Sequence, residues 1–327
     1  MAKNHPVIHI CPPSGGGVYD YAELITRNTP NAQLMPLSQQ TKINVPEGVN
    51  CIIHYSGYGY AKRGAPEWLI SWLKTQRPRI NKLGIWFHEI YATGSPWSSA
   101  FWLSPVQRNI ARRLAESSDF WITNRDKSAD WLSHHADKIP HATLPVFSNV
   151  GESTIYPTER QPKIIIFGGA ALRSETYRAA GKELFTWADS KKLEIHDIGP
   201  KISDPSISFL LKQNHVMEHG RLEKDVVNQH ISSSMFGVVR YPKSHISKSG
   251  VFASYCAHGT CPVVISEKYE MSDGLVANEH YLAGIEAARE HYASSKKIGS
   301  SAWEWYQQHN INKHIKTLDS ILCPEIL

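Results

Sequence analysis

The chain shows one local pattern at two places: a short apolar, β-branched run, then glycines, then a helix-forming segment. The first copy is PVIHIC at 6–11 followed by SGGGVYDYAELI at 14–25. The second is KIIIFGGA at 163–170 followed by a helical segment at 174–190. Strands that alternate with helices form parallel sheets covered by helices on both faces. Each copy therefore predicts the start of a separate α/β domain.

The length of 327 residues is too great for one ordinary hydrophobic core and fits two domains of about 150 residues. The segment 144–163 contains three prolines and no helical periodicity, which is typical of a linker. We predict an α/β fold with two Rossmann-like domains facing across a cleft. The expected boundaries are 1–150, 151–300 and a C-terminal segment, 301–327, that crosses back to the first domain as one long helix.

Composition and charge exclude several classes of protein. The chain is 41% hydrophobic and 20% charged, so it is not disordered, and it has no run of about 18 apolar residues that would span a membrane. Residues 1–150 contain 15 Lys and Arg against 10 Asp and Glu, whereas the rest contains 20 of each. A basic first half suits phosphates or an anionic membrane face, although chance variation explains it equally well.

The N-terminus and the cysteines indicate a cellular compartment. MAKNHPVIHIC lacks the long apolar stretch of a signal peptide, and the five cysteines form no C-x-x-C pair. We expect reduced thiols and a cytoplasmic protein, with contact at the inner face of the plasma membrane as an option.

The segment SHISKSGVFASYCAHGTCPVV at 244–264 predicts a phosphate-binding turn. A short helix begins near Gly250 and ends at Gly259, which suits a left-handed C-terminal cap. The free N–H groups and positive dipole at its start are complemented by the charge of Lys248, the hydroxyl of Ser249 and the small Gly250, with Val251 next in line. The alternative is a capped surface helix with a solvated lysine.

A second candidate is the loop that contains Gly15, Gly16 and Gly17. Consecutive glycines between a strand and a helix let the backbone approach a ligand closely. The spacing is not G-x-G-x-x-G, so the dinucleotide fingerprint is absent. A merely flexible loop is the alternative.

A third candidate is the pair His88 and Glu89, at the end of the predicted strand 82–90. Ligands of open parallel sheets bind beyond the carboxyl ends of the strands. Either side chain could accept a proton or hold a sugar hydroxyl. A structural histidine is the alternative.

Aromatic and basic side chains follow two strands and suggest an acceptor or membrane-facing lip. Core packing explains them equally well. They are Tyr58, Tyr60, Lys62, Arg63 and Trp97.

Several signatures of other chemistry are absent from the sequence. It contains no G-x-x-x-x-G-K-[ST], H-E-x-x-H, G-x-S-x-G or D-x-D, which argues against P-loop kinases, zincins, serine hydrolases and a metal–dicarboxylate site. The 17 histidines are scattered, and adjacent His134 and His135 point in different directions on a helix. We therefore expect no metal site and no cofactor.

Together, GGGVYDYAELI, HEIYATGSPWSSAFWLSP, LPVFSNVGE and KSGVFASYCAHGTCPVV resemble the retaining glycosyltransferases of the GT-B fold. This is the group-one, family-four type, which includes enzymes of bacterial polysaccharide assembly. The resemblance covers most of the chain. It implies that the C-terminal domain binds a nucleotide sugar, which we expect to be a UDP-sugar. It also implies that the N-terminal domain binds a saccharide or lipid-linked acceptor. It implies retention at the anomeric carbon without a covalent intermediate. We expect no nucleic-acid partner and no metal.

The resemblance also assigns roles to residues. Gly15, Gly16 and Gly17 would approach the donor diphosphate, and His88 would lie near the transferred sugar. Lys248, Ser249 and Gly250 would hold the phosphates.

The sequence departs from the family at its two usual glutamates, which are Ile246 and Ser254 here. Gly169 replaces the usual arginine after the first strand of the second domain, and Arg173 is the candidate to supply its charge. These departures leave two alternatives open: a non-catalytic nucleotide-sugar-binding scaffold of the same fold, and a sugar-nucleotide epimerase. An epimerase would need acid and base carboxylates in place of the acceptor lip.

Overall fold

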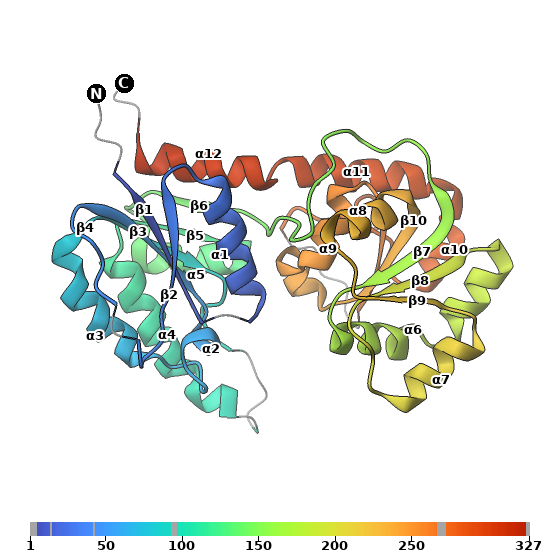
Figure 1. The fold of residues 1–327 in the computed structure, drawn as a ribbon, viewed down its shortest axis with the longest axis horizontal. Coiled ribbons are helices and arrows are strands. Elements are labelled where there is room, and N and C mark those ends of the chain that lie inside the picture. The colour runs from blue at the N-terminus through green and yellow to red at the C-terminus, as the bar shows by residue number, and fades with distance from the viewer. Residues whose placement is uncertain are drawn as a thin grey trace. The chain divides into compact units, whose positions relative to one another are not determined.

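A computed structural model of the chain divides into two compact units (Figure 1). Unit 1 combines Met1–Pro145 with Ile311–Leu327, and unit 2 is Val146–Asn310. The predicted boundary after residue 150 lies in the same linker, whereas the one after residue 300 falls inside a helix of unit 2. The structure describes residues 5–13, 15–41, 43–92, 97, 99–266 and 273–324.

Unit 1 is built on a six-stranded parallel sheet in the order β2-β1-β3-β4-β5-β6. All seven residues of β3 are buried, as expected for a parallel sheet covered on both faces. The strands are β1 (Val7–Cys11), β2 (Ala32–Pro36), β3 (Val49–Tyr55), β4 (Ile80–Phe87), β5 (Phe120–Thr123) and β6 (His141–Thr143). The helices are α1 (Gly17–Asn28), α2 (Gly57–Tyr60), α3 (Glu67–Gln76), α4 (Ser99–Ser117), α5 (Asp126–Ala136) and α12 (Ile311–Leu322), with a 3₁₀ turn η1 (Arg77–Arg79).

Unit 2 is built on a five-stranded parallel sheet in the order β11-β10-β7-β8-β9. Its strands are β7 (Gln161–Phe167), β8 (Glu194–Ile198), β9 (Met217–Gly220), β10 (Ser234–Arg240) and β11 (Cys261–Ile265). Its helices are α6 (Ala170–Lys191), α7 (Pro205–Gln213), α8 (Lys224–Ser233), α9 (Gly250–Ala257), α10 (Ile285–Glu290) and α11 (Ser295–Gln307), with 3₁₀ turns η2 (Lys243–Lys248) and η3 (Tyr292–Ser294).

Each unit has its own hydrophobic core. In unit 1 the core joins side chains of the sheet to helices α3 and α4, with Leu69 and Ile110 fully buried. In unit 2 the sheet packs on α6, with Trp187 fully buried against Phe236. Separate cores confirm the prediction of two α/β units with parallel sheets.

The predicted single helix at 301–322 is wrong, because residues 308–310 separate α11 from α12. The last turn of α11 is anchored in unit 2, where the hydroxyl of Tyr306 donates to Glu152 and accepts from the N–H of Ser148. Helix α12 belongs to unit 1, where the Lys82 ammonium donates to the carbonyls of Ile321 and Leu322 at its end. Within the described ranges, no helix has the length and apolarity to cross a membrane.

Candidate functional site

Helix α9 begins at Gly250, where the sequence predicted it. The Ser249 hydroxyl accepts the N–H of Phe252 at 3.2 Å, so it acts as the N-cap. Lys248 is half-buried at the end of η2, one residue before this cap. The segment therefore brings a lysine and the amino end of an eight-residue helix together at the carboxyl side of β10.

The turn after β7 lies against this helix start. Gly168 has a φ of 122°, and a β-carbon there would lie 3.1 Å from Cγ2 of Val251. Gly169 follows and precedes α6 without a side-chain cap, and a β-carbon on it would meet nothing within 4 Å. Two helix amino ends thus meet at one edge of the sheet, beside open space, which favours an anion.

Arg173 lies beneath this edge, fully buried. Its guanidinium is ion-paired with Asp197 and donates to the carbonyls of Gly168 and Pro200. Burial raises the pKa of Asp197, and the Arg173 charge opposes that rise. The turns after β7 and β8 are therefore joined by one arginine, so its donors are directed at the protein rather than outward.

The two positions where the family carries glutamates are buried in unit 2. Ile246 is 2% exposed and Ser254 is fully buried. The Ser254 hydroxyl donates to the carbonyl of Gly250 and lies 2.9 Å from the hydroxyl of Ser148. These contacts make Ser254 a packing residue that ties the linker to α9.

Lys243, in the same 3₁₀ turn, escaped the sequence analysis. Its side chain is 4% exposed, and its ammonium lies 5.3 Å from the centroid of the Tyr281 ring. Burial lowers its pKa. A buried lysine near a candidate ligand-binding edge is a typical functional signal. YPKSHISKSG contains two lysines, and nothing in the sequence marks Lys243 as the buried one.

The glycine loop of unit 1 lies between β1 and α1. Gly15 and Gly16 have φ values of 106° and 151°, which other residues rarely adopt. Gly17 is the first residue of α1, and a β-carbon on any of the three would meet nothing within 4 Å. The loop is exposed at the carboxyl end of β1.

His88 follows β4, which ends at Phe87, and its ring faces the interior. Nε2 of His88 lies 3.1 Å from Nδ1 of His54, whose Nε2 lies 2.9 Å from Nδ1 of His9. Burial lowers the pKa of His9 to about 3 and that of His54 well below its ordinary value. The sequence analysis missed this row of three imidazoles, which run from the core to the strand end.

Glu89 lies on the exposed side of the same strand end. It accepts a hydrogen bond from the Ser56 hydroxyl at 2.9 Å. The two residues of the predicted pair therefore differ in environment: Glu89 meets solvent, whereas His88 is coupled to the core. Residues 93–96 of the same predicted stretch lie outside the described residues.

The predicted aromatic and basic lip is exposed, with one exception. Tyr58 is 46% and Trp97 96% exposed, and Lys62 and Arg63 also face solvent. The exception is Tyr60, which is 7% exposed and packs against the core, so its assignment to an accessible surface is wrong.

Gln107 on α4 holds this loop in place. Its side-chain amide donates to the carbonyl of Arg63 at 3.1 Å and accepts the N–H of Ala92 at 2.7 Å. The loop after β3 and the loop after β4 are thus connected through one buried side chain. Sequence reasoning missed it because Gln107 looks like a surface residue of an amphipathic helix.

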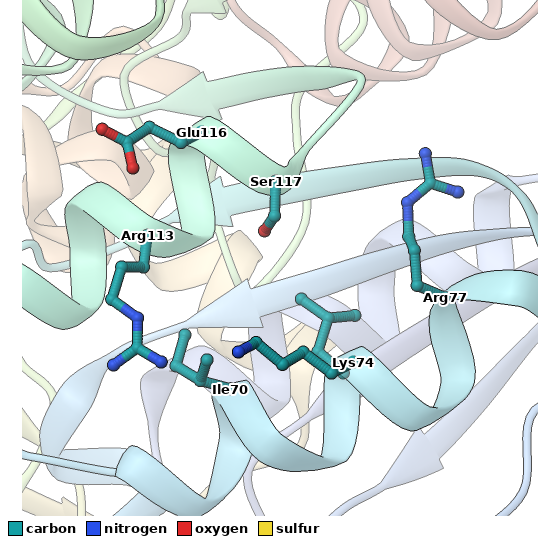
Figure 2. A pocket seen from close by; sticks show the side chains of 7 residues that line it. Ile70, Lys74, Arg77, Arg113, Glu116 and Ser117 are labelled. Atoms are coloured by element: carbon teal, nitrogen blue, oxygen red, sulfur yellow. The ribbon is translucent and has the colours of Figure 1, made fainter.

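A cavity of about 300 Å³ opens between α3 and α4 of unit 1 (Figure 2). Ile70 and Leu73 form an apolar part, and Lys74, Arg113 and Glu116 supply charges. These helix ends lead into β4 and β5, so the cavity lies toward the amino ends of the strands. It is therefore at the opposite edge from His88 and the glycine loop.

The expectation that the histidines are scattered is wrong for three of them in unit 2. His196, His219 and His230 each offer a ring nitrogen, and these nitrogens lie within 4.8 Å of one another. Sequence spacing hides the group because the fold brings together residues from two strands and a helix.

Several solved structures with the same fold are glycosyltransferases. The pneumococcal O-GlcNAc transferase GtfA, in complex with UDP and GlcNAc, has a TM-score of 0.56 at 14% identity. That comparison covers 85% of this chain and 58% of the GtfA chain. The lipopolysaccharide outer core galactosyltransferase WaaB has a TM-score of 0.53 at 11% identity, covering 97% of this chain and 99% of its own.

An α-glucosyltransferase in complex with UDP-glucose and abasic DNA also matches, with a TM-score of 0.53 at 11% identity over 98% of this chain and 99% of its own. No protein-family model and no curated protein sequence matches the chain. Identities this low establish the fold alone. The chain therefore has the GT-B fold that its sequence predicted.

Proposed function

We propose that the chain is a glycosyltransferase that moves a sugar from a nucleoside-diphosphate donor to a saccharide or lipid-linked saccharide acceptor. The observation that carries this proposal is the closeness of Gly168, before α6, to Val251 in the first turn of α9: a β-carbon on Gly168 would lie 3.1 Å from Cγ2 of Val251. A diphosphate is the class of ligand that two neighbouring helix starts suit.

The chemistry follows from the charge of the leaving group. The bond between the anomeric carbon and the diphosphate oxygen breaks as the acceptor hydroxyl oxygen bonds to that carbon. The nucleoside diphosphate gains negative charge as it leaves and takes up the hydroxyl proton. Lys248 and the N–H groups at the two helix starts would stabilise that charge, and one such contact is typically worth about 3 kcal/mol. Arg173 would act as a positioning residue, since its guanidinium already holds the two glycine turns.

The remaining features of the reaction rest on resemblance. Two of these solved structures, GtfA and the α-glucosyltransferase, contain UDP or UDP-glucose in their complexes, which supports a UDP-sugar as the donor. We further propose retention at the anomeric carbon without a metal at the diphosphate. The exposed lip of Tyr58, Lys62, Arg63 and Trp97 would meet the acceptor or an anionic membrane face in glycolipid or polysaccharide assembly.

The test is slow donor hydrolysis. We expect the full chain to release UDP from one of UDP-glucose, UDP-galactose or UDP-GlcNAc, and to bind UDP more tightly than GDP, ADP or TDP in calorimetry. UDP binding without any release would favour the non-catalytic scaffold, which is consistent with the loss of both family glutamates at Ile246 and Ser254. Failure to bind any of the four diphosphates would overturn the proposal.

A further inference from the structure

Three histidines of unit 2 converge where the edge of its sheet meets a helix. His196 is on β8, His219 on the edge strand β9, and His230 on α8. Nδ1 of His196 lies 2.9 Å from Nε2 of His219. The ring centroid of His230 lies 4.6 Å from that of His219 and 5.6 Å from that of His196.

The carboxylate of Glu194 determines how protons are arranged in this group. Its Oε2 lies 3.2 Å from Nε2 of His196, so it accepts the proton that this nitrogen carries. Nδ1 of His196 then presents a lone pair, to which Nε2–H of His219 donates. A metal ion would replace that shared proton, and Glu194 would orient the His196 ring, as carboxylates commonly do for metal-bound histidines.

Two charged side chains lie beside the histidines, Lys163 on β7 and Glu194 on β8. The positive charge of Lys163 would repel a bound cation. The carboxylate of Glu194 offsets that charge, because Glu194 and Lys163 are paired in the register of β7 and β8.

We propose that His196, His219 and His230 bind one divalent transition-metal ion of the zinc class, with Glu194 as the positioning residue. Zinc binds imidazole nitrogen at about 2.0 Å, so two tetrahedral ligands lie about 3.3 Å apart. The nitrogens of His196 and His219 are already close to that separation. The ring nitrogen of His230 lies within 4.8 Å of the other two and would move closer on binding.

The position of the site indicates that the ion would stabilise the sheet edge and would take no part in sugar transfer. β9 has four residues, three of them exposed, and it is the last strand in the sheet order. Short edge strands are weakly held. An ion bound by β8, β9 and α8 would fasten this strand to its neighbours, and the proposal holds whether or not the chain transfers sugars.

The experiment is Zn²⁺ binding to the full chain, freed of metal, by competition with a chromophoric chelator. A Cys323→Ser background removes the exposed thiol at the end of α12. We expect one tight site, weakened at least tenfold in His219→Ala and in His230→Ala. Glu194→Gln should weaken it about tenfold, the lower end for loss of such a partner. Co²⁺ should give the visible absorption of a tetrahedral site in the background protein but not in His219→Ala or His230→Ala.

The matched control is the double variant His134→Ala/His135→Ala, which removes two other histidines from α5. It should retain the tight site, and Zn²⁺ should raise the melting temperature of the background protein and of this control but not of His219→Ala. Circular dichroism checks that each variant folds. If His219→Ala or His230→Ala does not fold, His230→Gln is tested in its place. Equal zinc affinity in the background protein and both histidine variants would overturn the proposal, as would the absence of a tight site.

Discussion

The guanidinium of Arg173 is ion-paired with the carboxylate of Asp197, and both side chains are almost fully buried in unit 2. The Tyr177 hydroxyl donates to the same carboxylate at 3.0 Å. Removing one partner leaves a buried charge without its counterion, which costs about 3–5 kcal/mol. We expect Arg173→Met to lower the free energy of unfolding of unit 2 by that amount, as measured by urea denaturation.

The control is Arg178, a half-exposed arginine that is ion-paired with both Glu175 and Asp204, where Arg178→Met should lower stability much less than Arg173→Met does. The double variant Arg173→Met/Asp197→Leu should recover part of the loss, because no charge is then left unpaired. If Arg173→Met folds as stably as the wild type and loses only UDP affinity, Arg173 contacts the diphosphate directly.

Lys248→Ala should weaken UDP binding more than threefold, or about 0.65 kcal/mol, because the proposed contact is between full charges. Calorimetric titration measures the change. Lys182→Ala is the control, since Lys182 is exposed in the interior of α6, away from its amino end. A change below threefold in Lys248→Ala, or an equal change in the control, would remove Lys248 from the donor site.

Gly16→Ala should destabilise unit 1 by about 1–3 kcal/mol, because its φ of 151° and ψ of 163° are accessible only to glycine. Gly17→Ala is the matched control: it adds a methyl group to open space at the first residue of α1 and should be neutral or slightly stabilising. Denaturant titration compares the two variants. Equal stabilities would show that the loop relaxes without strain.

Unit 1 should lose stability as the pH falls below 6.5. The buried His9 has its pKa lowered from 6.5 to about 3, so between these values the unfolded chain binds a proton that the folded unit does not. The loss from His9 alone should reach about 2 kcal/mol at pH 5. The lowered pKa of His54 adds to it in the same direction.

Urea denaturation at pH 7.5, 6 and 5 measures this slope. His9→Leu should flatten it by about one proton, whereas His134→Ala, at an exposed position, should leave it unchanged. A wild-type slope of zero between pH 6.5 and 5 would mean that the row of imidazoles accepts protons in the folded state.

Ser254→Glu should not restore a donor contact, although it returns the family residue to its place. The Ser254 hydroxyl is fully buried between Gly250 and Ser148, so a carboxylate there would lose its hydration. We expect a large loss of unfolding free energy, against about 1–2 kcal/mol for Ser254→Ala. Faster donor hydrolysis in Ser254→Glu would show that the site opens to accept the glutamate.

The sequence by itself determined the class of fold. Runs such as PVIHIC and KIIIF are nearly continuous in apolar residues and do not alternate with polar ones. Such runs are typical of strands that are buried on both faces of a parallel sheet. The sequence also predicted the glycine turns after two of those strands and the start of α9 at Ser249-Gly250. These features are local, because backbone conformation and helix capping depend on near neighbours.

Only the tertiary structure decided which side chains meet. The sequence suggested Arg173 as a cation available to the diphosphate. In the structure it is ion-paired with Asp197 on β8. The row from His9 to His88 and the group of His196, His219 and His230 also join residues far apart along the chain. Burial, partners and hence charge state depend on how strands are ordered in a sheet, and no local pattern encodes that order.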